Sequence, residues 1–179
     1  LILVVDTKSA SAGESFLVEL AVLQKEEKKL GIKELAAFVE GICLKVRHYF
    51  CVDDLNFLYR GGRLTKTQAV LGGMLNVKPI LIINDEGKIV PLTKVRGRKE
   101  VVETLSDYVV DHINVEISDR VAIMNADDEE YAEKVKSRIL HKNPSLKVEI
   151  RSISYAVGSH SGPGTMAVVF FGKDRNFHA

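Results

Sequence analysis

Arginine and histidine side chains beside glycines are the candidate ligand-binding groups of this sequence. Arg60 and Arg63 flank a Gly-Gly pair, Arg96 and Arg98 flank a single glycine, and His160 comes shortly before a Gly-Pro-Gly run. Glycine allows positive φ and a close approach of the backbone to a ligand. The planar guanidinium group suits carboxylates and phosphates. These patches therefore predict recognition of an acidic group, with the alternative that the side chains are merely exposed and have no role.

Two of these patches coincide with the start of a predicted helix. Arg63 and Lys66 stand at the start of one helix, and Arg98 and Lys99 stand at the start of another. A helix N-terminus already carries partial positive charge, so added cations there favour an acidic or phosphate-bearing partner. Solvent-exposed lysine without a function is the alternative for Lys66 and Lys99.

The turn around His160 could bind an anion or hold a catalytic group. We expect a loop over residues 158–164, in which backbone amides near Gly162 and Gly164 form an anion-binding nest and His160 adds a hydrogen bond. Ser159 and Ser161 allow a nucleophile to be considered, but no Gly-x-Ser-x-Gly motif surrounds either of them. An unremarkable loop histidine is the plain alternative.

Composition excludes several classes of function. The 179 residues carry a formal net charge of +1, which does not indicate a nucleic-acid binder. The apolar fraction of 46% is ample for a globular core. No apolar run approaches the roughly 20 residues of a membrane span, so stable membrane insertion is not expected. We therefore expect no nucleic-acid partner and a globular protein of the cytoplasm.

Cysteine and histidine spacing predicts neither a metal site nor a redox centre. Cys43 and Cys51 lie among apolar neighbours, which favours reduced thiols in the core over a disulfide between them. Metal-ligand spacing is absent from the remaining histidines, which are His48, His112, His141 and His178. No cofactor is predicted.

Apolar periodicity and capping residues predict a chain of alternating strands and helices. Strands are expected at residues 1–5, 47–52, 77–84, 88–95, 120–125, 147–152 and 165–171. Helices are expected after capping boxes at Ser11, Thr65 and Asp127, around residues 35–42 and 55–59, and over residues 98–112. The pattern predicts an α/β (α+β) fold with helices over a mixed sheet.

The sequence also predicts a division into two domains. Residues 1–52 read as the carboxyl-terminal part of a first α/β domain, whose other strands lie outside this sequence, and residues 53–179 read as a second domain. Residues 1–5 look like a buried strand that starts at the first residue, so we expect the sequence to begin inside a longer protein.

Five segments in order resemble the DegV-like fatty-acid-binding proteins of bacteria. The matching segments are residues 6–11 (DTKSAS), 59–64 (YRGGRL), 71–81 (LGGMLNVKPIL), 95–98 (VRGR) and 160–164 (HSGPG). Thr165 and Met74 depart slightly from the usual pattern. The Asp-Ser-Thr start and Ser-Gly-Thr-like loop of the family's first domain, which help to hold the ligand headgroup, do not occur in this sequence.

The resemblance implies a carrier without catalytic activity of its own. Such a protein encloses a long-chain fatty acid and presents its carboxylate to a separate fatty-acid kinase, which makes an acyl phosphate for phospholipid synthesis. By position, His160, Gly162 and Gly164 would lie at the headgroup. Motif arginines Arg60, Arg63, Arg96 and Arg98 would act at the headgroup mouth or in kinase docking. The tail lining, or simply core, would include Leu71, Leu75, Ile80 and Leu81.

Two rival functions remain open from the residues alone. One is a small hydrolase or phosphotransferase that uses His160 with Ser159 or Ser161, although no acid–base partner is apparent. The other is a regulatory module that binds an acidic partner through its glycine-flanked arginines.

Overall fold

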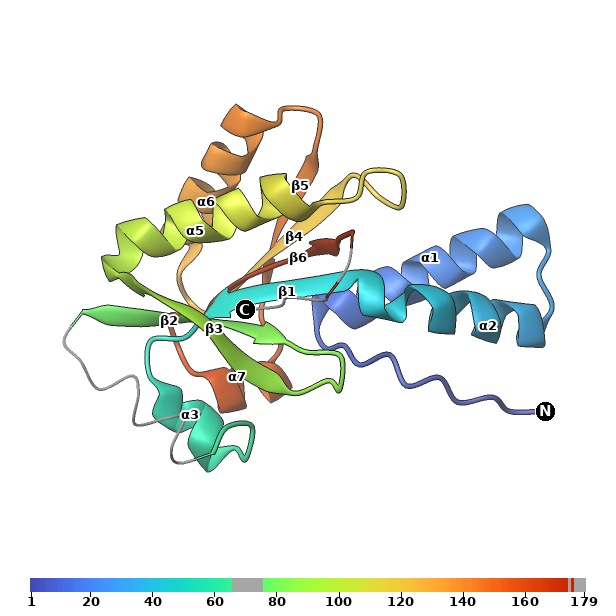
Figure 1. The fold of residues 1–179 in the computed structure, drawn as a ribbon, viewed down its shortest axis with the longest axis horizontal. Coiled ribbons are helices and arrows are strands. Elements are labelled where there is room, and N and C mark those ends of the chain that lie inside the picture. Colours follow the sequence, from blue (N-terminus) through green and yellow to red (C-terminus); the bar gives the residue numbers. More distant parts are fainter. Residues whose placement is uncertain (66–75, 174, 176–179) are drawn as a thin grey trace.

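A computed structural model describes residues 1–65, 76–173 and 175, and these residues build one six-stranded mixed sheet (Figure 1). The spatial order of the strands is β3-β2-β1-β6-β4-β5. Neighbouring strands are antiparallel except for the parallel pair β4 and β5. Their bounds are β1 Val46–Cys51, β2 Val77–Ile83, β3 Ile89–Arg96, β4 Arg120–Asn125, β5 Lys147–Ser152 and β6 Met166–Phe171.

Helices cover both faces of the sheet, and one helical pair extends beyond it (Figure 1). The helices are α1 Ala12–Lys28, α2 Ile32–Ile42, α3 Leu55–Arg60, α5 Gly97–His112, α6 Glu129–Lys142 and α7 Tyr155–Ser161, with a 3-10 turn, η1, at Cys43–Lys45. α5 and α6 lie on one face, α3 and α7 lie on the other, and α1 and α2 project past the end of the strands. The predicted α/β class with helices over a mixed sheet is confirmed.

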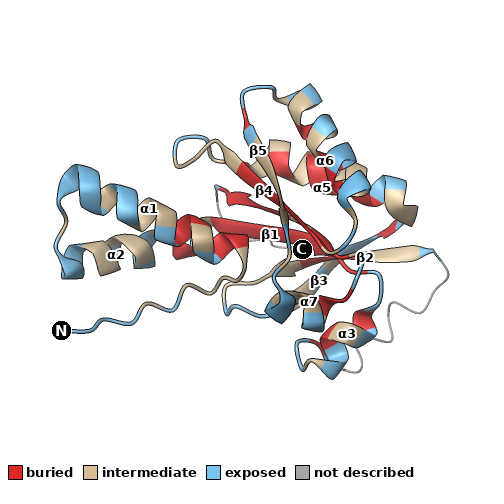
Figure 2. Cartoon of the chain, turned by 180° about the vertical axis from the view of Figure 1, so that it is seen from behind, coloured by how far each residue is buried: buried red, intermediate tan, exposed pale blue. Residues whose placement is uncertain are grey.

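Alternation along the strands gives the sheet two apolar faces. Tyr49 and Val168 are paired neighbours that pack in the large core cluster with α5 and α6. Phe50 is paired with Ala167 and with Leu81, and these three side chains belong to the clusters on the α3 and α7 side. The central strands are accordingly buried on both faces (Figure 2).

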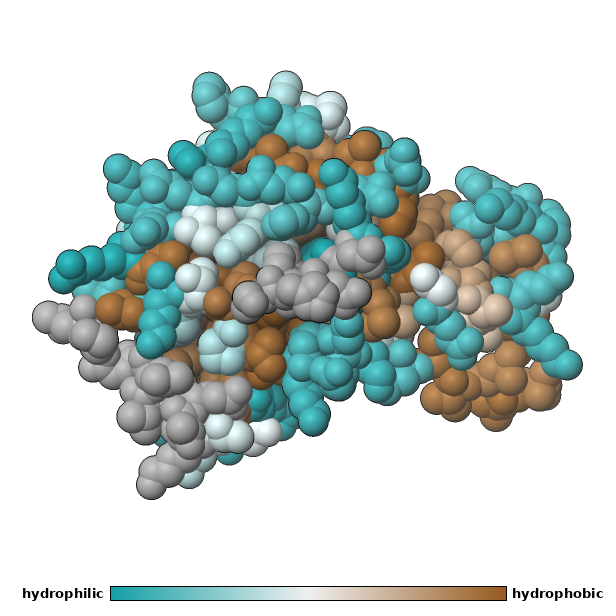
Figure 3. Space-filling model, viewed as in Figure 1, coloured by the Kyte–Doolittle hydropathy of each residue, from teal (hydrophilic) through white to brown (hydrophobic). Residues whose placement is uncertain are grey.

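The amino-terminal residues differ from the prediction. Residues 1–5 form no strand, and the side chains of Leu1, Ile2 and Val4 are 83–89% exposed. The apolar run therefore lies on the surface beneath the α1–α2 pair, where apolar atoms gather in Figure 3. An apolar run becomes a buried strand only if a sheet edge is present to pair with it, and the sequence pattern alone does not show whether one is.

The predicted strand at residues 47–52 also has a different setting. β1 lies inside the sheet, hydrogen-bonded to β2 on one side and to β6 on the other. The expectation that this strand belongs to a layer completed by strands outside the sequence is therefore wrong. The strand before the predicted boundary at residue 52 shares one sheet with the strands after it.

Local capping differs from the sequence pattern at several helix starts. Ser11 is the N-cap of α1 but has φ 55° and makes no side-chain capping bond, so the predicted capping box there is wrong. Asp128, not Asp127, is the N-cap of α6, and its carboxylate is paired with Arg98 instead. Thr65 is described, but the rest of its expected capping box, the helix expected after it, Leu71 and Leu75 fall within residues 66–75, outside the described residues.

Candidate functional site

A cavity of about 330 Å³ lies between the sheet and the α3–α7 side of the molecule. Its volume falls within the ~300–1,000 Å³ typical of small-molecule sites. Most of the side chains around it are apolar. The lining residues are Ala10, Ser11, His48, Phe50, Leu58, Arg63, Ile83, Ile89, Met124, Ile153, Ala156, Val157, His160, Ser161, Thr165, Ala167 and Val169.

The cavity runs lengthwise along β6. Thr165, Ala167 and Val169 alternate along the chain, so they present one continuous stripe to the cavity. At a rise of ~3.3 Å per residue this stripe is about 13 Å long. His160 and Thr165 belong to one end, whereas His48, which is paired with Val169, belongs to the other. A channel of this shape suits an elongated ligand.

The end near His160, which we call the polar end, gathers hydrogen-bonding groups. The half-buried ring of His160 lies against Gly61 of the α3 loop, where a Cβ would overlap Nδ1. The exposed Arg63 belongs to the same loop and lines the cavity. Its Nη1 donates to the Gly61 carbonyl at 2.5 Å, which holds the guanidinium near the cavity. The structure thus brings together His160 and Arg63 from segments about 100 residues apart in sequence.

Ser161 adds a buried polar atom at this end. Its Oγ is buried and has no hydrogen-bond partner among the described residues. Neighbouring Thr165 is already engaged, because its Oγ1 lies 3.0 Å from the Ser161 carbonyl and 2.8 Å from the Gly162 carbonyl. A buried hydroxyl without a partner costs about 1–3 kcal/mol. Sequence reasoning considered Ser161 only as a nucleophile and missed this possible binding role.

The glycines after His160 shape the turn and do not offer free amides. The expectation of a loop over residues 158–164 was wrong for its first part, because α7 continues through Ser161. The Gly162 amide donates to the Gly158 carbonyl and the Gly164 amide donates to the Ala126 carbonyl, both at 2.8 Å. These two amides are therefore not available for the expected anion-binding nest.

Positive φ explains why glycine stands at both positions. Gly162 and Gly164 have φ of 80° and 72°. A Cβ on Gly162 would lie 2.6 Å from the Phe57 ring, and one on Gly164 would lie 2.7 Å from Nη2 of Arg98. The Gly-Pro-Gly run is therefore required for close packing that fixes the end of α7, and so the position of His160.

The opposite end of the cavity, which we call the far end, is lined by His48, Ile83, Ile89 and residues 10–11. Burial, followed by the charge of Arg175, lowers the pKa of His48 to about 4, so the imidazole is neutral at pH 7. Its Nε2 lies 3.1 Å from the Ala10 carbonyl. Since a carbonyl only accepts, Nε2 carries the proton. None of the described residues that line the cavity is acidic.

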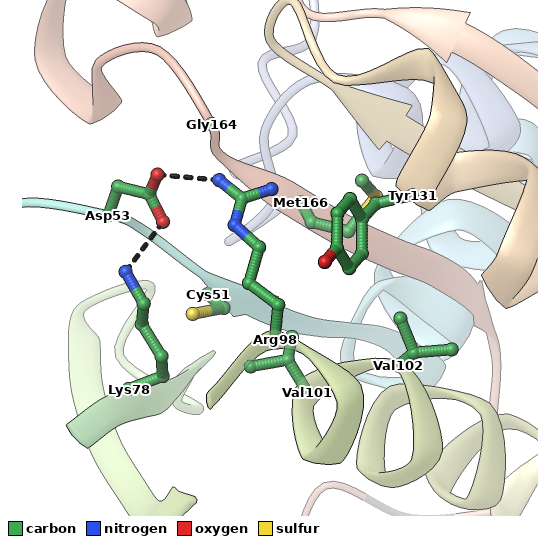
Figure 4. A pocket seen from close by; sticks show the side chains of 9 residues that line it. All are labelled: Cys51, Asp53, Lys78, Arg98, Val101, Val102, Tyr131, Gly164 and Met166. Atoms are coloured by element: carbon green, nitrogen blue, oxygen red, sulfur yellow. Dashed lines mark hydrogen bonds and ion pairs between the residues drawn. The ribbon is translucent and has the colours of Figure 1, made fainter. Parts of the chain in front are cut away.

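Arg98 lies outside this cavity, in a separate ion-pair cluster (Figure 4). Its guanidinium pairs with Asp53 at 2.5 Å and with Asp128, and it stacks over the Tyr131 ring at 4.8 Å. Asp53 also accepts from Lys78 at 2.8 Å. The hollow there measures only about 10 Å³, which leaves room for no more than one water. The cluster therefore ties together β1, β2, α5 and α6 and leaves no space for a ligand.

The remaining predicted residues have varied positions. Arg60 and Arg96 are exposed, and Arg60 lies over the Phe57 ring at 4.9 Å. Leu81 packs on the cavity side of the sheet but is not one of the lining residues. Ile80 packs on the opposite face with α5, because neighbouring strand residues point to opposite sides.

Other kinds of site find no support in the described part of the chain. No group of histidine, cysteine, aspartate or glutamate side chains there could hold a metal ion. Cys43 and Cys51 are free thiols, and burial raises the pKa of Cys51 to about 12, so it stays protonated. No described helix is long and apolar enough to cross a bilayer.

A second hollow of about 350 Å³ lies between α1, α2 and residues 3–7.

Several known proteins are similar to this chain in sequence and in fold. A DegV domain-containing protein of Streptococcus pyogenes is 36% identical over 173 residues, which cover 96% of this chain and 58% of that protein. The crystal structure of the fatty acid binding DegV family protein SAG1342 from Streptococcus agalactiae is 29% identical with a TM-score of 0.82, and the match covers 97% of this chain and 60% of that one.

A third likeness concerns the fold alone. The Streptococcus pneumoniae Fatty Acid Kinase (Fak) B3 protein, loaded with linoleic acid, has a TM-score of 0.82 at 21% identity, with 97% of this chain and 60% of that chain covered. The chain thus spans about six-tenths of the length of these proteins. The family model described as "Uncharacterised protein, DegV family" matches residues 2–173, and the chain belongs to the DegV family.

Proposed function

We propose that this chain binds a long-chain fatty acid in the 330 Å³ cavity, with the acyl tail along β6 and the carboxylate at the polar end. The observation that carries the proposal is the shape and polarity of the cavity: an apolar channel with a histidine and an arginine at one end and no acidic side chain among its described lining residues. Two structures of similar fold support it: SAG1342, which is described as fatty acid binding, and the Fak B3 protein, which is loaded with linoleic acid.

Energetics favour a carrier that holds its ligand by the tail. Burial of an acyl chain contributes about 0.8 kcal/mol per methylene, so a 16-carbon tail represents roughly 10 kcal/mol before the costs of association. Hydrogen bonds to the carboxylate from His160, Ser161 or Arg63 contribute about 0.5–3 kcal/mol each. The tail therefore provides most of the affinity, and the carboxylate stays near the exposed Arg63.

The carboxylate is available for a second protein in this arrangement. We propose that a fatty-acid kinase in the cytoplasm phosphorylates it to an acyl phosphate for phospholipid synthesis, and that the exposed Arg60 and Arg96 contribute to docking. This chain itself acts as the carrier. In the described residues, His160 has no carboxylate partner, and Ser159 donates its hydroxyl to the Ala156 carbonyl and makes no bond to the imidazole. A catalytic triad is therefore not assembled here.

Solvent extraction of the purified protein followed by mass spectrometry tests binding. We expect about one long-chain fatty acid per chain, and a protein that neither carries nor takes up fatty acid would overturn the proposal. His160→Ala should weaken binding by up to about 100-fold, in line with the loss of one charge-assisted hydrogen bond. His141→Ala, at an exposed position on α6, is the matched control and should bind as the wild type does.

Acyl-phosphate formation with a fatty-acid kinase and ATP tests the second step. Reversal of charge at Arg60 and Arg96, with glutamate at both positions, should abolish product while the bound lipid remains. If the double variant supports phosphorylation at the wild-type rate, these arginines have no part in docking.

A further inference from the structure

Arg175 is a buried arginine whose guanidinium is saturated with hydrogen bonds. The residue is 6% exposed. Nε donates to the Val46 carbonyl at 2.7 Å. Nη1 donates to the carbonyls of Lys8 and Asn84 at 3.1 Å, and Nη2 donates to the Ser9 hydroxyl and the Cys43 carbonyl at 3.2 Å. These contacts use the full donor capacity of a guanidinium group.

The acceptors belong to segments that are distant in sequence. Residues 8–9 precede α1, Cys43 begins η1, Val46 begins β1, and Asn84 follows β2. All five acceptors are uncharged oxygens, so no carboxylate of the described residues bonds directly to the buried cation. Burial of a charge is costly unless its hydrogen bonds are all made. The arginine therefore fastens these segments together at one point.

Residues 8–11, which we call the end segment, form part of the cavity wall. Ala10 and Ser11 line the cavity, and the Ala10 carbonyl faces Nε2 of His48. The end segment belongs to no strand, and both of its terminal residues have positive φ, 50° at Lys8 and 55° at Ser11. Such conformations are strained in non-glycine residues and persist only where the surroundings hold them.

Strand register places the Arg175 contacts beyond the far end of the cavity. Ile83 is the next β2 residue after Ile82, which is paired with Tyr49, so Ile83 lies level with His48. Val46 and Asn84 each lie one or two residues farther from His160 along their strands. Arg175 thus joins the end segment to the sheet at the point where the channel stops.

We propose that Arg175 is a positioning residue that holds the end segment across the far end of the cavity and thereby sets the longest acyl chain that the cavity accepts. The proposal rests on the proposed fatty-acid binding. It assigns chain-length selection to a residue that does not itself line the cavity.

Affinities for saturated fatty acids of increasing length test this role. In the wild type, affinity should rise about fourfold per methylene and then stop rising at a limiting length. Arg175→Lys keeps the charge but has three donors in place of five, so the limit should move to longer chains while short chains bind nearly as before. Arg120→Lys is the control, because Arg120 is paired with Glu19 and Glu149 away from the cavity, and it should leave the limit unchanged.

Ala10→Leu is a second variant with the opposite expected effect. Its three extra carbons should fill the far end, so the limit should move to shorter chains. The proposal is overturned if Arg175→Lys lowers affinity equally at every length, or if Ala10→Leu leaves the limit where it is. If Arg175→Lys does not fold, the Ala10→Leu result decides.

Hydrogen exchange separates this proposal from the binding function on which it rests. In the ligand-free protein, amides of the end segment should exchange faster in Arg175→Lys than in the wild type. A wild type that binds no fatty acid, together with faster exchange in the variant, refutes the binding function but not the proposal that Arg175 holds the end segment. Unchanged exchange refutes that proposal itself.

Discussion

Ala167→Leu should separate ligand binding from fold stability. Ala167 lies at the middle of the β6 stripe, paired with Phe50 and Met124, and lines the cavity. Leucine adds three carbons there and displaces a similar length of acyl chain. At about 0.8 kcal/mol per methylene, fatty-acid affinity should fall by about 2.4 kcal/mol, or roughly 50-fold. The ligand-free protein should gain about 0.5–2 kcal/mol, because the cavity is partly filled.

Titration of delipidated protein with a fatty acid and denaturant unfolding without ligand measure the two effects. The control is Val168→Leu, whose side chain is fully buried on the opposite face of the same strand. Overpacking there should cost about 1–3 kcal/mol of stability and leave affinity unchanged. An Ala167→Leu variant with wild-type affinity would show that the acyl chain does not pass along β6.

Three further predictions concern stability. Gly164→Ala should cost about 1–3 kcal/mol, since its Cβ would overlap the Asp53 carboxylate at φ 72°; Gly62→Ala, at φ 74° in open space, should cost less in the same unfolding assay. Burial and the charge of Arg175 lower the pKa of His48 to about 4. The stability that the neutral imidazole contributes to the folded state is therefore complete above pH ~6.5 and is lost as pH falls toward 4. His48→Phe should flatten the unfolding free energy across that window, and an unflattened curve would contradict the assignment. Burial alone would raise the pKa of Asp53, but its lysine and arginine partners outweigh burial and lower the pKa overall. The stability difference between wild type and Asp53→Asn should therefore be present above pH ~4 and shrink below that pH.

Strand and helix positions were largely predictable because their signals are local. The apolar run in residues 120–125, the alternation in residues 147–152 and the apolar period in residues 98–112 correspond to β4, β5 and α5 within a residue or two. Residues 1–5 were not predictable, since the same apolar pattern suits a buried strand and an exposed extended run. What decides between them is a pairing partner, which no local pattern reveals.

The polar end of the site was predicted in part. His160 and Arg63 were identified by their glycine neighbours, and both line the cavity. Arg98 carried the same signal, yet its partners Asp53 and Asp128 come from other parts of the chain. The sequence assigned no role at the cavity to His48 or Arg175, because each depends on contacts between segments far apart. A buried arginine bonded to backbone carbonyls has no sequence motif.

Photocrosslinking with a fatty acid that carries a diazirine at its methyl end tests the position of the acyl chain most directly. The label should attach at the far end of the cavity, to Ile83, Val169 or residues 10–11, and His160→Ala should reduce its yield. Attachment instead to Val18 or Leu35, in the hollow between α1 and α2, would contradict the account.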